Sequence, residues 1–138
     1  MAAHHKLTVA GYFKNLAQIA DFIDQAAVQA NLDDKAAYAI KMAVDEACTN
    51  IIEHAYGGEG NGHIQLDCAI QSDGLRVTIV DQGVPFDPTQ VAKLNTQAPL
   101  PERKRRGMGL FFIHNLVDTV EYNFNTPQGN QLILFKHR

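Results

Sequence analysis

Residues 40–56 constrain the fold of this chain most strongly, because their apolar side chains recur at the spacing of an α-helix. Wound at about 100° per residue, they form one stripe that should face a core. The stripe consists of Ile40, Val44, Ala47, Ile51 and Ala55. Glu46 and Asn50 are four residues apart and stack one turn above the other along the edge of this stripe, and His54 continues the row.

The polar row along the stripe has two interpretations. Packing would hold a carboxylate and an amide half desolvated at this edge, which suits a general base and a metal ligand. An ordinary amphipathic helix also carries polar residues on its rim. The helix alone does not separate the two interpretations, so the rest of the chain has to decide.

Length and charge limit the kinds of protein this chain can be. Its 138 residues are expected to form a single domain, 1–138, with one core. A formal net charge of -3 gives no reason to expect direct binding to nucleic acid. No apolar run approaches the roughly 20 residues that span a membrane, and no signal peptide is visible, so a cytoplasmic protein is expected. Cys48 and Cys68 stand outside any CxxC or metal-type spacing and should be free, buried thiols.

Hydrophobic periodicity predicts three helices and five strands in the order β-α-α-β-β-loop-α-β-β. The helices are expected over 15–30, from 33 or 34 to 55, and over 110–117. The strands are expected over 7–11, 63–70, 75–80, 120–124 and 131–136. The fold class is therefore α+β: a two-layer α/β sandwich in which a mixed, mostly antiparallel five-stranded sheet carries three helices on one face.

Residues 84–106 show little regular patterning. Prolines stand at 85, 88, 99 and 101, and a basic run occupies 103–106. A structureless stretch of this length in a compact domain is usually a functional lid or a disordered segment, although a short helix over 89–94 also fits the pattern. We expect a lid.

A second polar motif, Asp81-x-Gly83, ends the third predicted strand. An aspartate at a strand end can accept a hydrogen bond from an exocyclic amine such as N6 of adenine, and glycine lets the backbone come close to a flat ring. The plainer interpretation is a strand-ending turn, because Asp and Gly are common turn residues.

A third motif, Gly107-Met108-Gly109, precedes the last predicted helix. Two glycines before a helix expose backbone N–H groups, and a helix N-terminus favours anions, so a phosphate site is expected there. The spacing matches neither the Walker A loop nor the dinucleotide-binding fingerprint. The preceding basic run, Arg103 to Arg106, is typical of a solvated loop, but its position beside the glycines favours contact with phosphate.

In this order, the polar helix, the strand end, the lid and the glycine pair indicate a Mg-ATP site. The sequence resembles the GHKL (Bergerat-fold) ATPases, which share the histidine-kinase-like ATPase fold, and within them the anti-sigma-factor serine kinases. The resemblance covers about residues 35–136 and rests on three boxes. The N box is matched by Asp45-Glu46-Ala47-Cys48-Thr49-Asn50 and His54-Ala55-Tyr56, the first glycine box by Asp81-Gln82-Gly83-Val84-Pro85-Phe86-Asp87-Pro88, and the second by Gly107-Met108-Gly109-Leu110.

The resemblance implies a role for each matched residue, with ATP and Mg²⁺ as cofactors. Asn50 would ligate Mg²⁺ between the phosphates, and Glu46 would be the general base toward the attacking hydroxyl. Asp81 would hydrogen-bond adenine, with Gly83 beside it. The phosphate-binding residues would be Arg105, Arg106, Gly107, Met108, Gly109 and Leu110. The family pattern has Gly-Thr before the last strand, where this sequence has Gly129-Asn130.

The resemblance also implies a function: an ATP-dependent serine/threonine protein kinase that sequesters a sigma factor and phosphorylates an anti-anti-sigma (STAS) protein. Homodimers are common in this group. One alternative is an ATP-dependent partner switch with little or no phosphate transfer, but a pure binder would not need Glu46. Another is the detached ATPase domain of a sensor histidine kinase, which is disfavoured because the chain has no room for a helical dimerisation domain with a phosphoacceptor histidine. No membrane association is expected.

Overall fold

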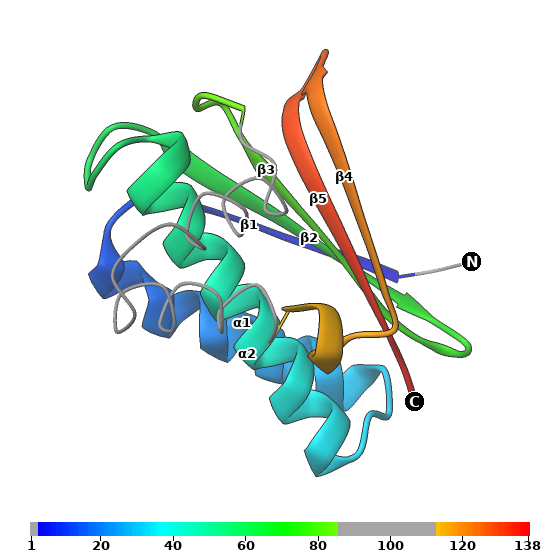
Figure 1. Cartoon of the computed structure of the whole chain (residues 1–138). Helices are drawn as coiled ribbons and strands as arrows, with labels where there is room; N and C mark the ends of the chain where they lie inside the picture. Colours follow the sequence, from blue (N-terminus) through cyan, green and yellow to red (C-terminus); the bar gives the residue numbers. More distant parts are fainter. Residues whose placement is uncertain (1–2, 86–112) are drawn as a thin grey trace, which may run out of the picture.

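The computed structural model of the chain describes residues 3–85 and 113–138. In these residues a twisted five-stranded sheet forms one layer, and the helices form a second layer against one face of it (Figure 1). The elements are β1 (Ala3–Ala10), the 3-10 helix η1 (Phe13–Asn15), α1 (Leu16–Gln29), α2 (Asp34–Asn50), the π-helix η2 (Ile51–Ala55), β2 (His63–Gln71), β3 (Gly74–Asp81), β4 (Thr119–Thr126) and β5 (Gly129–His137). A further helical segment at 113–116 precedes β4. The predicted α+β sandwich is confirmed, but the sheet, expected to be mixed, is antiparallel at each pairing of the described strands.

The sheet has the strand order β1-β2-β3-β5-β4, and all four of these pairings are antiparallel. β5 rather than β4 lies beside β3, so β4 forms the edge of the sheet. The register places Asp81 between Ile64 of β2 and Asn130 of β5. The end of β3 therefore lies between the beginnings of two other strands.

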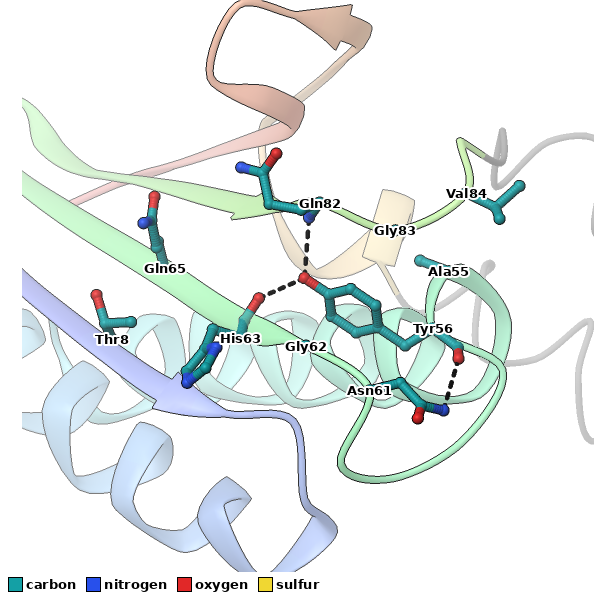
Figure 2. Close-up of a pocket in the computed structure, with 10 residues that line it drawn as sticks. All are labelled: Thr8, Ala55, Tyr56, Asn61, Gly62, His63, Gln65, Gln82, Gly83 and Val84. Atoms are coloured by element: carbon teal, nitrogen blue, oxygen red, sulfur yellow. Dashed lines mark hydrogen bonds between the residues drawn. The ribbon is translucent and has the colours of Figure 1, made fainter.

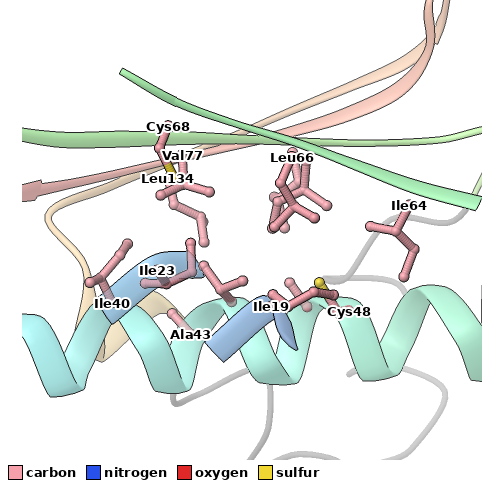
Figure 3. Close-up of a cluster of buried hydrophobic side chains, with 14 of the residues drawn as sticks. Ile19, Ile23, Ile40, Ala43, Cys48, Ile64, Leu66, Cys68, Val77 and Leu134 are labelled. Carbon is pink, nitrogen blue, oxygen red and sulfur yellow. The ribbon is translucent and has the colours of Figure 1, made fainter. Parts of the chain in front are cut away.

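The hydrophobic core lies between the sheet and the helices α1 and α2 (Figure 3). The stripe predicted from the sequence is buried, with Ile40 and Val44 fully enclosed. Ile64 and Leu66 of β2 meet it from the sheet side, as the alternating pattern predicts. Each fully buried aliphatic side chain contributes about 1.5–3 kcal/mol, so this shared core fixes the position of α2 on the sheet. Both cysteines are free and buried, as predicted.

Helix α2 begins at a side-chain cap and ends in a wider turn than the sequence predicts. The carboxylate of Asp33 accepts the N–H of Ala36 at 2.7 Å, which satisfies a backbone donor at the helix start. At the other end the expected α-helix gives way to the π-helix η2 at Ile51, where Tyr56 donates its N–H to the carbonyl of Ile51 at 2.9 Å. A π turn contains an extra residue, so His54 does not continue the Glu46–Asn50 row at α-helical spacing.

Two glycines directly follow the end of this helical segment. Gly57 and Gly58 have positive φ angles of 68° and 139°, which residues with a side chain rarely adopt. The N–H of Gly58 bonds to the carbonyl of Ile52 at 2.8 Å and closes the last turn. The chain then leaves toward β2.

The strands extend further than the sequence predicts. β1 was expected over 7–11 but covers 3–10, because its first residues pair with β2 from Ala3 opposite Ile70 onward. Those residues are mostly exposed, so no apolar alternation marks them in the sequence. The expected short helix at 89–94, the lid beyond residue 85 and the beginning of the helix predicted at 110–117 lie outside the described residues. No helix in the described ranges is long and apolar enough to cross a membrane.

Candidate functional site

The polar row of α2 lies on the rim of the buried stripe, as the helical spacing predicts. Glu46 and Asn50 are both half-buried, whereas Val44 and Ala47 beside them are enclosed in the core. Thr49 donates its hydroxyl back to the carbonyl of Asp45 at 2.9 Å and is thereby held within the helix. Glu46 and Asn50 are thus presented by a helix that the core holds in place.

Glu46 has an environment that strengthens its carboxylate as a proton acceptor. Burial raises the pKa of Glu46, and the negative charges of Asp45 and Glu53 raise it further. Burial also raises the pKa of Asp45. A carboxylate is most effective as a general base when its pKa approaches the working pH. Upward shifts from burial and like charges are common at catalytic sites.

The end of β3 holds a buried carboxylate in a tight turn. Asp81 is 2% exposed, and its Oδ1 accepts the N–H of Gly83 at 2.9 Å and the side-chain amide of Asn130 at 3.1 Å. Burial raises the pKa of Asp81, and the two hydrogen bonds lower it in part, so that the net shift is upward. The bond from Gly83 makes the strand-ending turn that was the plainer interpretation of this motif. It engages Oδ1, and the turn is therefore compatible with a ligand contact at Oδ2.

Backbone contacts bring the end of β3 against the end of η2. Val84 donates its N–H to the carbonyl of Ala55 at 2.8 Å. Gly83 lies so close that a Cβ on it would stand 2.4 Å from that same carbonyl oxygen. The sequence suggested that this glycine admits a flat ring, whereas the close approach in the structure is to Ala55. The Asp81–Gly83 turn thus packs against Ala55, at the end of the helical segment that carries Glu46 and Asn50.

Tyr56 closes this junction from the other side (Figure 2). Its hydroxyl accepts the N–H of Gln82 at 2.9 Å and donates to the carbonyl of His63 at 2.5 Å. One side chain thereby ties the end of η2 to the end of β3 and the start of β2. The sequence placed Tyr56 within the N box but gave it no role, because both of its partners are backbone groups that no side-chain pattern reveals.

A pocket of 650 Å³ borders this junction (Figure 2). Its lining includes Ala55 and Gly83, together with Thr8, Gln65 and Gln82. Glu46, Asn50 and Asp81 do not line it. The pocket therefore lies beside the expected nucleotide site, and the motif residues, not this cavity, define the candidate site.

Replacing Gly83 with alanine should destabilise the protein by about 1–3 kcal/mol, because the added methyl group would overlap backbone atoms that cannot rotate away. Urea denaturation measures this free energy. Gly57→Ala is the matched control, because Gly57 has a positive φ but nothing within 4 Å of its Cβ position, and it should cost only about 1 kcal/mol. Equal losses in the two variants would contradict the proposed packing of Gly83 on Ala55.

The remaining residues of the predicted site lie outside the part of the chain that the structure describes. They are Arg105, Arg106, Gly107, Met108, Gly109 and Leu110. Their assignment to phosphate stays a prediction. Within the described ranges, no cluster of three or more His, Cys, Asp or Glu side chains could hold a metal ion.

The chain is similar in sequence to several known proteins. Residues 12–136 match the model of the histidine kinase-like ATPase domain. The chain is 34% identical over 97 residues to the anti-sigma F factor of Oceanobacillus iheyensis, covering 70% of this chain and 66% of the relative. It is 36% identical over 86 residues to the serine-protein kinase RsbW of Halalkalibacterium halodurans, covering 59% and 52%. It is 31% identical over 98 residues to the anti-sigma F factor of Bacillus licheniformis, covering 71% and 67%. The chain thus spans about half to two thirds of the length of these curated relatives.

Proposed function

Since the chain belongs to the family of histidine kinase-like ATPase domains, we propose that it is an ATP-dependent serine/threonine protein kinase that sequesters a sigma factor. Its substrate would be an anti-anti-sigma protein of the STAS type. The observation that carries the proposal is the junction at Ala55 and Gly83, which joins the Glu46–Asn50 helix to the Asp81 turn. The names of the relatives, anti-sigma F factor and serine-protein kinase, support the choice of reaction and partner. A regulator of this kind would work in the cytoplasm.

The nucleotide would bind with its base at the Asp81 turn. Asp81 is a hydrogen-bond acceptor with Oδ1 already engaged, and it would accept the 6-amino group of adenine through Oδ2. The phosphates would extend toward Asn50 and contact Arg105, Arg106 and the backbone from Gly107 to Leu110. A site that reads a base with a buried polar group discriminates strongly against analogues that leave the group unpaired.

Magnesium fits the donor set near Asn50. Mg²⁺ keeps several water ligands and often takes only one or two ligands from the protein, the rest coming from phosphate oxygens. When bound, Mg²⁺ would neutralise charge on the phosphates, and Asn50 would hold it through its side-chain oxygen.

In the transfer step, Glu46 would accept the proton of the substrate hydroxyl as that oxygen bonds to the γ-phosphorus. The bond between the γ-phosphorus and the bridging oxygen would break, and ADP would leave with that oxygen. Phosphoryl transfer depends mainly on positioning and on charge neutralisation. The chain contributes the fixed helix that carries Glu46 and Asn50 and the fixed turn that carries Asp81.

Calorimetric titration with ATP and Mg²⁺ tests the first step of this proposal, and heat of binding is expected. The absence of both heat and a thermal shift at millimolar ATP would contradict it. A pull-down from the native cell, run with ATP and again with ADP, tests the partners. A sigma factor should be recovered in one eluate and a STAS protein in the other. Phosphate transfer from ATP to the recovered STAS protein would then distinguish a kinase from a partner switch without transfer.

A further inference from the structure

Asp81 and Asn130 are the two polar side chains that are fully buried in the described part of the chain. Each is 2% exposed. They lie opposite one another in the register of β3 and β5, 49 residues apart in the sequence. A buried polar group destabilises a fold unless it is hydrogen-bonded.

The side chain of Asn130 uses its whole amide. Its Nδ2 donates to Oδ1 of Asp81 at 3.1 Å and to the carbonyl of Gly83 at 3.0 Å, while its Oδ1 accepts the N–H of Asn125 at 3.1 Å. Turning the amide over would set its oxygen against a carboxylate and a carbonyl and its NH₂ group against an N–H. The network therefore permits only one orientation of the amide.

The backbone beside Asn130 is equally constrained. Gly129 has a φ of 120°, and a Cβ on it would stand 2.4 Å from the carbonyl oxygen of Asp81. The end of the β4–β5 hairpin is thus pressed directly against the end of β3. This contact places the amide of Asn130 on Asp81 and leaves little room for adjustment.

The two carboxylate oxygens of Asp81 differ in their hydrogen bonding. Within residues 3–85 and 113–138, both donors that reach the carboxylate go to Oδ1, one from Gly83 and one from Asn130. Oδ2 stays available as an acceptor. The bond from Asn130 also lowers the pKa of Asp81 against the effect of burial, which favours the ionised form. An ionised Oδ2 can accept a hydrogen bond from an amino group. A protonated Oδ2 would instead be a hydrogen-bond donor facing another donor.

We propose that Asn130 is a positioning residue that selects adenine, because it occupies Oδ1 of Asp81 and directs Oδ2 toward the 6-amino group of the base. This role rests on the proposed binding of ATP and extends it to base specificity. Asn130 does not touch the nucleotide itself. It acts through Asp81 and through the carbonyl of Gly83, which it holds at the same time.

The test compares ATP with purine riboside 5′-triphosphate, which carries hydrogen in place of the 6-amino group. Dissociation constants are measured by calorimetry for the wild type and for Asn130→Ala. The wild type should prefer ATP by about 10-fold or more, which is the loss expected when a buried acceptor is left unpaired. In Asn130→Ala this ratio should fall toward one, through a loss of ATP affinity with little change for the analogue. A structural role would instead weaken both ligands by the same factor, and that outcome would overturn the proposal.

Two further variants keep the test decisive. Asn130→Leu fills the space that alanine leaves empty and still removes both donors, so it should also abolish the preference for ATP if Asn130→Ala does not fold. Asn123→Ala is the matched control, because Asn123 lies on the neighbouring strand β4, opposite Gln131, with its side chain on the other face of the sheet, and it should leave the ratio unchanged. A wild type that binds ATP and variants that keep its ratio would overturn the role of Asn130 alone. A wild type that binds no ATP would overturn this role and the proposed function together.

Discussion

Replacing Glu46 with glutamine should lower the rate of phosphate transfer by roughly 100-fold or more, while the affinity for Mg-ATP stays close to that of the wild type. A positioned general base typically contributes about 10²–10⁴-fold to a rate. Glutamine keeps the shape and the hydrogen-bonding capacity of Glu46 but cannot take up a proton. Because Glu46 is half-buried on the rim of α2, the substitution should disturb neither the core nor the fold.

The pH dependence should distinguish a base from a residue that merely binds substrate. Burial raises the pKa of Glu46, with help from Asp45 and Glu53. The carboxyl is protonated, and hence inactive as a base, below its raised pKa. The wild-type rate should therefore fall as the pH is lowered through the raised pKa of Glu46, whereas the residual rate of Glu46→Gln should stay flat over the same interval.

Asn50→Ala provides the contrasting variant on the same face of α2. It removes the proposed magnesium ligand, so metal-dependent binding of ATP should weaken together with turnover. A single-turnover transfer assay on the STAS protein, run beside an ATP titration for each variant, measures both quantities. Wild-type transfer by Glu46→Gln would refute the kinase mechanism and leave an ATP-dependent partner switch in its place.

Replacing Asp81 with asparagine should weaken the binding of ATP by about 10–100-fold, the factor that corresponds to one buried donor left without an acceptor. The asparagine oxygen can still accept the bonds from Gly83 and Asn130 that now reach Oδ1. Its NH₂ group would then occupy the place of Oδ2 and face the 6-amino group donor to donor. Inosine triphosphate, which carries an acceptor at this position, should lose far less affinity or gain some.

Asp81→Asn should be as stable as the wild type near neutral pH. The pKa of Asp81 is raised in the folded state, so above this pKa the folded protein bears an unfavourable buried charge that the unfolded chain does not. Asparagine removes this charge. Thermal denaturation at neutral pH compares the stability of Asp81→Asn with that of the wild type. Asp67→Asn, which makes the same change on the opposite face of β2 where Asp67 pairs with His4, should leave nucleotide affinity unchanged. A collapse of the melting temperature in Asp81→Asn would show that Asp81 is structural.

Sequence alone determined the features of this protein that depend on local periodicity. The helical spacing of Ile40, Val44 and Ala47 predicted which face of α2 is buried, and the alternation in β2 predicted which face of the sheet meets it. The turn at Asp81 and Gly83 could also be predicted from the sequence, because its hydrogen bond spans only two residues. These features follow from the pitch of a helix and the pleat of a strand, which the chain carries within a few residues.

Only the tertiary structure decided which distant groups meet. The pair of Asp81 and Asn130 arises from the register of β3 and β5. The hydrogen bond between the Tyr56 hydroxyl and the N–H of Gln82 joins two regions that lie 26 residues apart in the sequence. The π turn at Ile51–Ala55 was likewise not predicted from the sequence, which gave an α-helix to the same end. A strand shows in its sequence which face it buries but not its neighbour, because the backbone groups that pair strands are the same for every residue and the choice among them is made by packing of the whole core.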